Sequence, residues 1–371
     1  MKNKTCFVFN QAPRYVESSY ILFDRELNIK WCFGSVDGDI KEMDHSLLKD
    51  VKVYKTKRCA KGTYKLDGLS EIAKDRSISS YVLIGDPQLL DTWTLPLLIK
   101  MFNRKAKIFF WTHGWYGKES KLKALVKKAY FRLVDGVLLY GNYARELMIK
   151  EGFKPETLFT IHNALHHDQQ LTLRNSIKPS LIYKDYFSNG SPNIIFIGRL
   201  TKVKQLDMVI NALATLKEKG ECYNLVFVGD GTEREALETF VKEKKLEKNV
   251  WFYGACYDEK QNAELIYNAD LCVAPGNIGL TAMHSLVFGC PAISHNDFKW
   301  QMPEFEAIHP GTTGDFFERN NVESLADTIS KWFAEHQNKR EEVRHACYDE
   351  IDNYWTPEFE LSVLKKALKI E

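Results

Sequence analysis

Short apolar runs alternate with amphipathic stretches along almost the whole chain. In the first half, runs of strand length occur at residues 5–9, 29–34, 51–54, 81–85, 107–111, 136–140 and 158–161. Segments with the spacing of a helix, such as residues 16–27 and 143–151, fit between several of these runs. Because strands that alternate with helices build parallel sheets, this pattern predicts an α/β fold.

The same alternation returns after a break. Residues 171–192 are polar, show no periodicity and contain the turn-forming sequence NGSP at 189–192, so we predict a linker or turn cluster there. Apolar runs follow at 193–197, 224–228, 250–253, 271–274 and 292–294. Two doubly wound, Rossmann-like domains are therefore expected, over residues 1–180 and 190–355. A last helix is expected over 356–371, because Thr356-Pro357 is a usual helix start.

Composition narrows the class of protein. The 371 residues are 44% hydrophobic and 27% charged, as in soluble globular proteins. A net charge of +2 gives no overall attraction to nucleic acid, so we expect no nucleic-acid partner. No run approaches the roughly 18 apolar residues that a membrane span needs. The apolar run at 6–9 is also too short for a signal peptide, so we expect a cytoplasmic protein.

Neither the cysteines nor the carboxylates predict a metal site. The eight cysteines are scattered without a CxxC pair, and five lie in apolar segments, so buried free thiols are expected. Asp37 and Asp39 form a DxD pair of the kind that can hold a metal–nucleotide complex. No other carboxylates obviously converge on this pair, and no metal is expected.

Two loops that follow predicted strands in the second half are candidate phosphate sites, because open parallel sheets bind ligands at the carboxyl ends of their strands. The loop after 193–197 contains Gly198, Arg199 and Lys204 and leads into a helix, so glycine, free N–H groups and cations could meet a phosphate there. A solvated basic loop explains these residues equally well. The loop after 224–228 contains Gly229 and Gly231, and a capped strand-to-helix turn explains it as well as a ligand does.

A third loop follows the run at 271–274. It contains the glycine-bearing sequence from Gly276 to Leu280 and opens a helix that carries His284 one turn in. An anionic group could bind at this helix start, although His284 considered alone is typical of a hydrogen-bonded structural histidine.

Two features of the first half also suggest ligands. His113 ends a strand between glycine and aromatic residues, which suits a sugar site but also a packed aromatic corner. From Lys100 to Arg132 there are ten Lys or Arg residues and a single acid, Glu119. Residues 118–134 are therefore either a solvated helix face or a contact for an anionic membrane surface or a lipid-phosphate acceptor.

Taken together, these segments resemble the retaining glycosyltransferases of family 4, which have the GT-B fold. The resemblance is carried by six segments in order: IIFIGRLTKVKQLD (194–207), NLVFVGDGTER (224–234), VWFYGA (250–255), NADLCVAPG (268–276), GLTAMHSLVFGCPAIS (279–294) and PEFEAIHPGTTGDFF (303–317). The first half matches more loosely, through WTHG (111–114) and IHNAL (161–165). The fold implied is two Rossmann-like domains facing a central cleft, with the C-terminal helix crossing back to the first domain.

The resemblance implies a role for each candidate residue. Arg199 and Lys204 match the pair of cations that binds the donor diphosphate and stabilises the leaving group. His113 matches the histidine that faces the donor sugar. Further nucleotide-sugar contacts are implied for Gly198, Gly229 and Gly231 on the phosphate side, for Tyr253, Gly254 and Ala255 at the nucleobase, and for Gly276, Asn277, Gly279, Leu280 and His284 in the third loop.

The chain departs from the family in the third loop. Family members carry two glutamates eight positions apart, and here Gly276 and His284 stand in their places. Histidine could bond ribose hydroxyls as the second glutamate does, and Asn277 or nearby backbone amides could replace the first. The segment after the first strand also lacks the family's glycine-rich loop.

The function expected is metal-independent sugar transfer from a nucleotide-diphosphate sugar to a glycan or lipid-linked acceptor in surface polysaccharide assembly, without a cofactor and with retention of configuration. The first domain would serve the acceptor, and the basic helix would place the enzyme peripherally on the cytoplasmic membrane. Three alternatives are a sugar-nucleotide epimerase of GT-B type, a noncatalytic nucleotide-sugar-binding subunit, and an oxidoreductase. The last would need a dinucleotide fingerprint, which fails at Arg234 and is absent near the first strand.

Overall fold

The computed structural model describes residues 4–35 and 41–370, which fold into two compact units. The first unit is Met1–His167 with Trp355–Glu371, and the second is Asp168–Tyr354. Asp37 and Asp39, the predicted DxD pair, lie outside the described residues.

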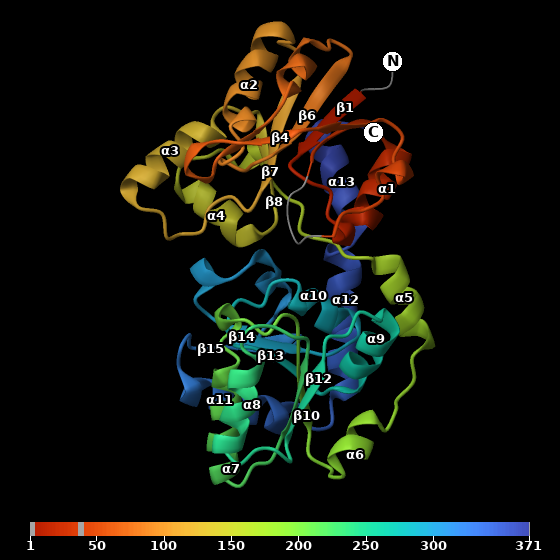
Figure 1. Cartoon of the computed structure of the whole chain (residues 1–371), viewed down its shortest axis with the longest axis vertical. Helices are drawn as coiled ribbons and strands as arrows, with labels where there is room; N and C mark the ends of the chain where they lie inside the picture. Colours follow the sequence, from red (N-terminus) through yellow and green to blue (C-terminus); the bar gives the residue numbers. More distant parts are fainter. Residues whose placement is uncertain (1–3, 36–40, 371) are drawn as a thin grey trace. The chain divides into compact units, whose positions relative to one another are not determined.

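A seven-stranded parallel sheet forms the centre of the first unit, in the order β3-β2-β1-β6-β7-β8-β9 (Figure 1). Its strands are β1 (Lys4–Phe9), β2 (Asn28–Gly34), β3 (Val51–Tyr54), β6 (Ile78–Ile84), β7 (Lys107–Thr112), β8 (Gly136–Leu139) and β9 (Leu158–Thr160). All seven strands expected from the apolar runs are present. The central strands read as continuous apolar runs because helices cover both faces of the sheet.

The helices of the first unit cover the sheet on both sides. They are α1 (Glu17–Glu26), α2 (Asp91–Phe102), α3 (Lys121–Phe131), α4 (Asn142–Lys150) and α13 (Pro357–Leu368). One core cluster joins Phe23 of α1 and Leu364 of α13 to β1 and β2, and the other joins α2, α3 and α4 to the opposite face. A short antiparallel pair, β4 (Thr56–Arg58) and β5 (Tyr64–Leu66), is added between β3 and β6.

The C-terminal helix α13 belongs to the first unit, as predicted, and packs against α1. Thr356 caps it by accepting a hydrogen bond from the Phe359 N–H at 3.1 Å, and Pro357 occupies the first turn. A proline at this place costs no hydrogen bond, because the first N–H groups of a helix have no partner inside it.

The second unit is a six-stranded parallel sheet in the order β12-β11-β10-β13-β14-β15. Its strands are β10 (Asn193–Ile197), β11 (Asn224–Val228), β12 (Val250–Gly254), β13 (Leu271–Ala274), β14 (Ala292–His295) and β15 (Gly314–Phe317). Its main helices are α7 (Asp207–Glu218), α8 (Arg234–Glu243), α9 (Glu259–Asn268), α10 (Thr281–Val287), α11 (Val322–His336) and α12 (Arg340–Tyr354). In both units the first strand lies inside the sheet, which is the Rossmann-like arrangement with a switch of strand order beside it.

The prediction of a linker or turn cluster at 171–192 is wrong where the segment is helical, whereas the NGSP sequence at 189–192 lies in neither a helix nor a strand. This segment forms α5 (His167–Ser176) and α6 (Ile182–Phe187), and from Asp168 onward it belongs to the second unit. Tyr183 is buried and its hydroxyl donates to the Leu265 carbonyl at 2.5 Å. The buried side chains of α6, Tyr183 and Phe187, lie one turn apart, but a helix of six residues is too short to show a repeating period.

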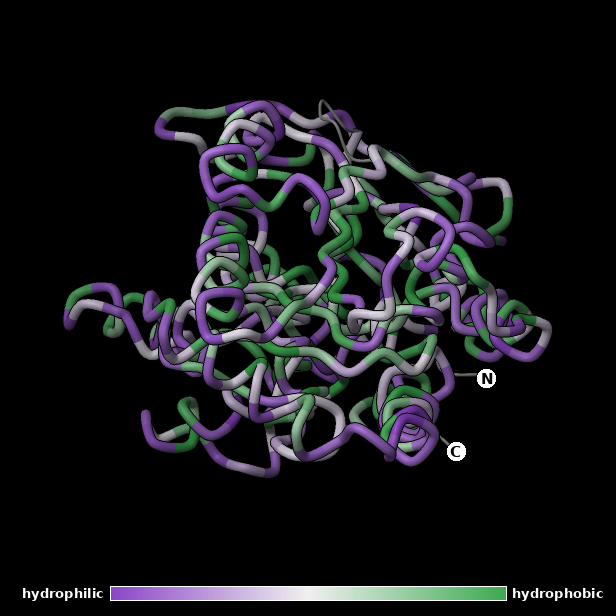
Figure 2. The backbone as a smooth tube through the Cα atoms, turned by 90° about the horizontal axis from the view of Figure 1, so that it is seen from below, coloured by the Kyte–Doolittle hydropathy of each residue, from purple (hydrophilic) through white to green (hydrophobic). Residues whose placement is uncertain are grey.

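In the view coloured by hydropathy, hydrophilic segments are frequent in the loops at the outside (Figure 2). The eight cysteines are free thiols, and five of them are buried, as the sequence predicts. Over the part of the chain that the structure describes, no helix is both long and apolar enough to cross a membrane.

Candidate functional site

Two glycine loops of the second unit pack backbone against backbone at the ends of neighbouring strands. Gly198 follows β10 and Gly229 follows β11, and a Cβ atom on Gly229 would lie 1.9 Å from the Gly198 carbonyl oxygen. Both glycines have φ of +145°, a conformation that favours glycine. Gly231 is as restricted, because its Cβ would lie 2.3 Å from the Leu200 carbonyl oxygen. At Gly229 and Gly231 there is therefore no room for a side chain.

The third predicted loop, which follows β13, packs against the first one. Gly276 follows β13, its N–H donates to the Lys204 carbonyl at 3.0 Å, and a Cβ there would lie 2.1 Å from the Val203 carbonyl oxygen. No glutamate side chain fits at Gly276 without moving the loop before α7. The structure thus gives a steric reason for the departure from the family pattern at this position.

The two predicted cations lie in the first of these loops. Lys204 Nζ donates to the carbonyl oxygen of Asn277 at 2.7 Å and to its Oδ1 at 2.9 Å. Burial lowers the pKa of Lys204 to about 8. The charge of Glu304 opposes this shift, and the charge of Arg199 adds to it. Arg199 is exposed, and within the described residues its guanidinium has no ion-pair partner. An anion at this loop would therefore meet one free cation and one partly engaged cation.

The segment predicted to contact a nucleobase adjoins the same loops. Tyr253 and Gly254 end β12, and the Gly229 N–H donates to the Gly254 carbonyl at 2.8 Å. The Tyr253 hydroxyl donates to Gln261 Oε1 at 3.1 Å, and Ala255 follows in the loop toward α9.

The rest of the third loop leads into α10. Gly279 has φ of +54°, and Leu280 occupies the N-cap position of the helix without a side-chain hydrogen bond. His284 lies one turn into α10 and is half-buried. The sheet order brings the ends of β12, β11, β10 and β13 side by side, so the candidate residues of the second unit lie along one edge.

His113 lies in the first unit, just after β7, and lines a cavity of about 470 Å³. Burial, together with the nearby charge of Lys127, lowers the pKa of His113 to about 4. The imidazole is therefore neutral near pH 7. Its ring lies 4.8 Å from the Tyr140 ring, centroid to centroid, and its buried Nδ1 atom has no hydrogen-bond partner among the residues that the structure describes.

Two acidic residues of this region were not predicted as important. Glu119 accepts hydrogen bonds from the N–H groups of Tyr116 at 2.9 Å, Gly117 at 2.9 Å and Lys118 at 3.0 Å, and from Lys127 Nζ at 2.6 Å. The sequence signal was present, because Glu119 is the single acid among ten cations.

Glu360 of α13 also lines the cavity and is bonded by the Ser19 hydroxyl. Burial raises the pKa of this carboxyl to about 8. Because Ser19 is hundreds of residues away in sequence, no local signal distinguishes Glu360 from an exposed acid on an amphipathic helix.

The basic segment forms α3, and the apolar side chains of its first two turns are largely exposed. Leu122 is 73% exposed and Leu125 is 65% exposed, whereas Tyr130 and Phe131 at the end of the helix are buried in the core. Lys128 pairs with Glu151 at 2.6 Å. The first two turns of α3 therefore present apolar side chains among lysines to solvent.

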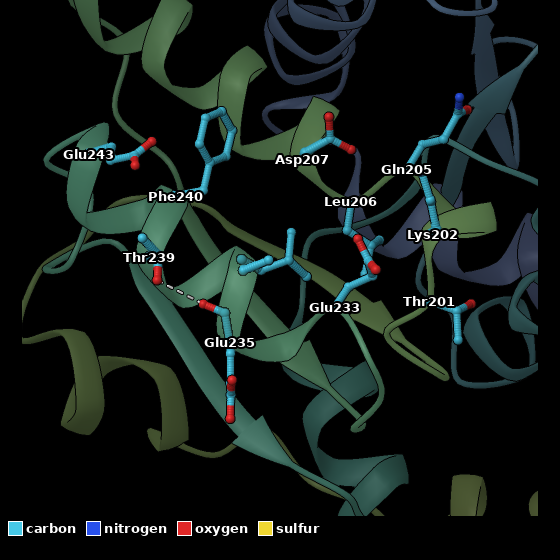
Figure 3. A pocket seen from close by; sticks show the side chains of 12 residues that line it. Thr201, Lys202, Gln205, Leu206, Asp207, Glu233, Glu235, Thr239, Phe240 and Glu243 are labelled. Carbon is cyan, nitrogen blue, oxygen red and sulfur yellow. Dashed lines mark hydrogen bonds between the residues drawn. The ribbon is translucent and has the colours of Figure 1, made fainter.

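A separate pocket of about 630 Å³ lies between α7 and α8 (Figure 3). Its lining includes the carboxylates of Asp207, Glu233, Glu235 and Glu243 and does not include Arg199 or Lys204. This charge is unsuited to a diphosphate. Elsewhere too, no three His, Cys, Asp or Glu side chains gather as metal ligands among the described residues.

Comparisons with known proteins show what this chain is similar to. Residues 182–349 match the model of "Glycosyl transferases group 1". An uncharacterized 41.2 kDa protein of the cps region of Klebsiella pneumoniae is 24% identical over 269 residues, which are 68% of each chain. A GDP-mannose-dependent alpha-(1-6)-phosphatidylinositol dimannoside mannosyltransferase of Mycobacterium tuberculosis is 36% identical over 103 residues, 27% of this chain and 26% of that protein.

Solved structures extend the likeness to the whole chain. The lipopolysaccharide outer core galactosyltransferase WaaB has a TM-score of 0.72 at 16% identity, over 99% of both chains. Anabaena HepE, solved with UDP, has a TM-score of 0.73 at 14% identity, over 100% of both chains. The chain thus has the GT-B fold, and its residues 182–349 form a glycosyl transferases group 1 domain.

Proposed function

We propose that this chain is a retaining, metal-independent transferase of family 4 that moves a sugar from a nucleotide-diphosphate sugar to a glycan or lipid-linked acceptor in surface polysaccharide assembly. The observation that carries the proposal is the joint packing of the loops at Gly198, Gly229 and Gly276. Their backbones meet at the strand ends, beside the cations Arg199 and Lys204.

In this proposal the two cations stabilise the diphosphate as it leaves. Breaking the glycosidic bond builds negative charge on the leaving phosphate, and preorganised positive groups lower that barrier. Arg199 is available for bidentate contact with phosphate oxygens. Lys204 has three N–H donors, of which the bonds to Asn277 use two, so one remains for a phosphate oxygen.

The remaining candidate residues would hold the nucleotide and the sugar. Tyr253, Gly254 and Ala255 would border the nucleobase, and His284 would bond the ribose hydroxyls in place of the family glutamate. Asn277 is a reasonable substitute for the glutamate that Gly276 cannot carry, because it is the next residue and already contacts Lys204. Neutral His113 would hydrogen-bond a sugar hydroxyl rather than act as a nucleophile.

The acceptor class is proposed from two sources. Among the matched proteins, one is a lipopolysaccharide outer core galactosyltransferase and one acts on a phosphatidylinositol dimannoside. The exposed apolar and basic face of α3, with Leu122, Leu125 and flanking lysines, supports peripheral binding to an anionic membrane from the cytoplasmic side.

The test of the transferase proposal is a thermal-shift panel with UDP, GDP, ADP, TDP, NAD and their sugar conjugates, with EDTA or with Mg²⁺. A ligand at ~100 times its dissociation constant should add about 2.7 kcal/mol of stability. We expect one nucleoside diphosphate and its sugar conjugates to stabilise the chain equally with EDTA and with Mg²⁺. Stabilisation by NAD alone, or by no nucleotide, contradicts the proposal, and dependence on Mg²⁺ contradicts its metal independence.

Membrane binding is tested by flotation with anionic vesicles. The wild-type chain should float with phosphatidylglycerol vesicles and less so in high salt, because screening weakens its lysine contacts. Replacing Leu122 and Leu125 by serine should abolish flotation, whereas Leu181→Ser, a matched change of an exposed leucine in the second unit, should leave it intact. Equal flotation of both variants contradicts the proposed surface.

A further inference from the structure

A buried glutamine, Gln301, joins the third loop of the second unit to the end of β14. It follows a short 3-10 helix (Phe298–Trp300) and is 4% exposed. Its Oε1 accepts from the Ile278 N–H at 3.0 Å, and its Nε2 donates to the Ser294 hydroxyl at 2.7 Å and to the His295 carbonyl at 3.0 Å. A side-chain amide has one acceptor oxygen and two N–H donors. These three bonds therefore engage both ends of the amide and fix the orientation of its plane.

The bond to Ile278 acts on the same peptide group that holds Lys204. The carbonyl of Asn277 and the N–H of Ile278 belong to one planar, rigid peptide group and point in opposite directions. Gln301 binds the N–H of this group, and Lys204 Nζ donates to its carbonyl oxygen at 2.7 Å. A rotation of this peptide plane would carry the carbonyl away from Lys204. The orientation that Gln301 imposes is therefore the one that Lys204 needs.

The residue before Asn277 is held by the same hydrogen bonds. Ser294 Oγ accepts from Gln301 and shares its single hydrogen between the carbonyls of Ala274 at 2.8 Å and Gly276 at 3.3 Å. The Ser294 side chain is fully buried, so water has little access to these bonds and they are stronger than exposed ones. The loop is thus fixed on both sides of Asn277.

The segment that carries Gln301 is itself anchored. The Phe298 ring lies 4.3 Å from the Phe305 ring and 5.1 Å from the Phe316 ring of β15, centroid to centroid. A side chain holds a loop in place where its own backbone is held by packing, and these rings supply that support.

We propose that Gln301 is a positioning residue of the sugar transfer, which orients the peptide group between Asn277 and Ile278 and so keeps the remaining N–H of Lys204 directed at the donor phosphate. The inference rests on the proposed function and deepens it, because it adds a residue that acts on the leaving group without contacting it. At 4% exposure Gln301 has almost no surface that a ligand could touch, so its effect passes through the loop. A misplacement of about 1 Å in a catalytic site can lower a rate by about 10²-fold.

The experiment measures kcat and the donor KM of sugar transfer by variants of the full chain, with the donor that the nucleotide panel identifies. Gln301→Met keeps the approximate volume of the side chain but removes the amide, and should lower kcat by about 10-fold or more. The donor KM should change less than kcat, because the proposed nucleobase contacts are left intact.

Asn224 provides the matched control. It is a buried amide of the same unit, 1% exposed, at the opposite, amino end of β11. Its Nδ2 donates to Asn189 Oδ1 at 2.9 Å and to the Ser191 carbonyl at 3.2 Å, so it too holds a loop. Asn224→Leu should lower the Tm, as Gln301→Met does, but leave kcat near wild type. This loop lies away from the strand ends that carry the site.

A double-mutant cycle separates positioning from general damage. Lys204→Met removes the group through which Gln301 acts. Adding Gln301→Met to it should therefore lower kcat further by less than about 2-fold, whereas independent effects would multiply. If Gln301→Met does not fold, Gln301→Asn takes its place in the cycle, because it keeps the amide but is one methylene too short to reach Ile278.

Each outcome decides the inference. A loss of kcat of about 10-fold or more in the Gln301 variant that disappears in the Lys204→Met background supports it. Near wild-type kcat in the Gln301 variant, an equal loss in Asn224→Leu, or the same further loss in the Lys204→Met background overturns it and leaves the transferase proposal standing. A wild-type chain that transfers no sugar overturns both.

Discussion

The two units place their candidate sites at the carboxyl ends of strands in similar parallel sheets, but they build them from different material. In the second unit the site is made of backbone, because glycines let the loops after β10, β11 and β13 touch. In the first unit the cavity is made of side chains, namely buried aromatic rings, a neutral histidine and carboxyl groups. A backbone site is specified by a few glycines and cations, whereas a side-chain site depends on residues from five or more distant segments.

This difference accounts for the part of the chain that the family model matches. The family model matches residues 182–349, which hold the backbone site, and does not extend to the first unit. A site for a nucleoside diphosphate must always fit the same arrangement of phosphate oxygens. The cavity of the first unit can vary, because side chains are replaced without rebuilding the fold.

The largest expected effect is on catalysis by the backbone site. Arg199→Ala should lower kcat by on the order of 10²-fold or more, because a preorganised charge on the leaving diphosphate is lost. Lys202→Ala, which removes another cation of the same loop, should retain near wild-type turnover. The measurement is sugar transfer with the donor that the nucleotide panel identifies. Near wild-type kcat for Arg199→Ala would remove this residue from the mechanism.

The second prediction concerns a buried carboxyl of the first unit. Burial raises the pKa of Glu360 from 4.5 to about 8, so the folded chain keeps a proton that the unfolded chain releases. The wild-type chain should therefore lose stability as the pH rises from about 4.5 to 8, by on the order of 3 kcal/mol. Glu360→Gln should remove this loss and be the more stable protein at pH 8. Urea unfolding across this pH range measures it.

The control for this prediction is Glu358→Gln, a change in the same first turn of α13 where the side chain is exposed. Its stability should follow the wild-type pH dependence. If Glu360→Gln also follows it, the carboxyl is ionised in the folded chain and its assigned pKa direction is wrong.

The third prediction tests whether nucleotide binding by the second unit needs the close backbone packing of its loops. Gly276→Ala places a Cβ atom 2.1 Å from the Val203 carbonyl oxygen, so the loops must move apart. We expect a loss of about 1–3 kcal/mol in the free energy of unfolding and weaker binding of the nucleoside diphosphate. Gly190→Ala, where nothing lies within 4 Å of the added atom, is the control. Unchanged nucleotide affinity in Gly276→Ala would show that the loop contact is dispensable.

The smallest effect is expected from a charge pair beside the cavity. Lys127→Met leaves the Glu119 carboxylate, which is largely buried, without its cation, and should cost about 1–2 kcal/mol of stability. Glu119 keeps its three backbone N–H donors, which limits the cost. Lys74→Met, which breaks the exposed pair with Glu71, should cost about 0.5 kcal/mol or less. Thermal unfolding of the two variants gives the comparison. Equal losses of stability would mean that burial does not strengthen the pair of Lys127 and Glu119.

The fold was largely predictable because its signals are local. Seven apolar runs in the first half and the runs that begin at Asn193 each became a parallel strand. The start of α13 was predictable from Thr356 and Pro357, since a cap acts on its own helix. The linker prediction failed at α6 because Tyr183 gains its stability from Leu265, a contact that no window of sequence contains.

The chain's sequence by itself determined the parallel α/β architecture, the order of the glycine loops and the cations placed among them, because these depend on short-range periodicity and on residues with special backbone freedom. Only the tertiary structure decided which groups are buried together. The tertiary structure brings the Val203 carbonyl so close to Gly276 that no side chain fits there. It also leaves Trp111 Nε1 without a partner among the described residues and buries Glu360, which raises the pKa of that carboxyl. Burial and desolvation depend on segments that meet only after folding, so no local pattern could have revealed them.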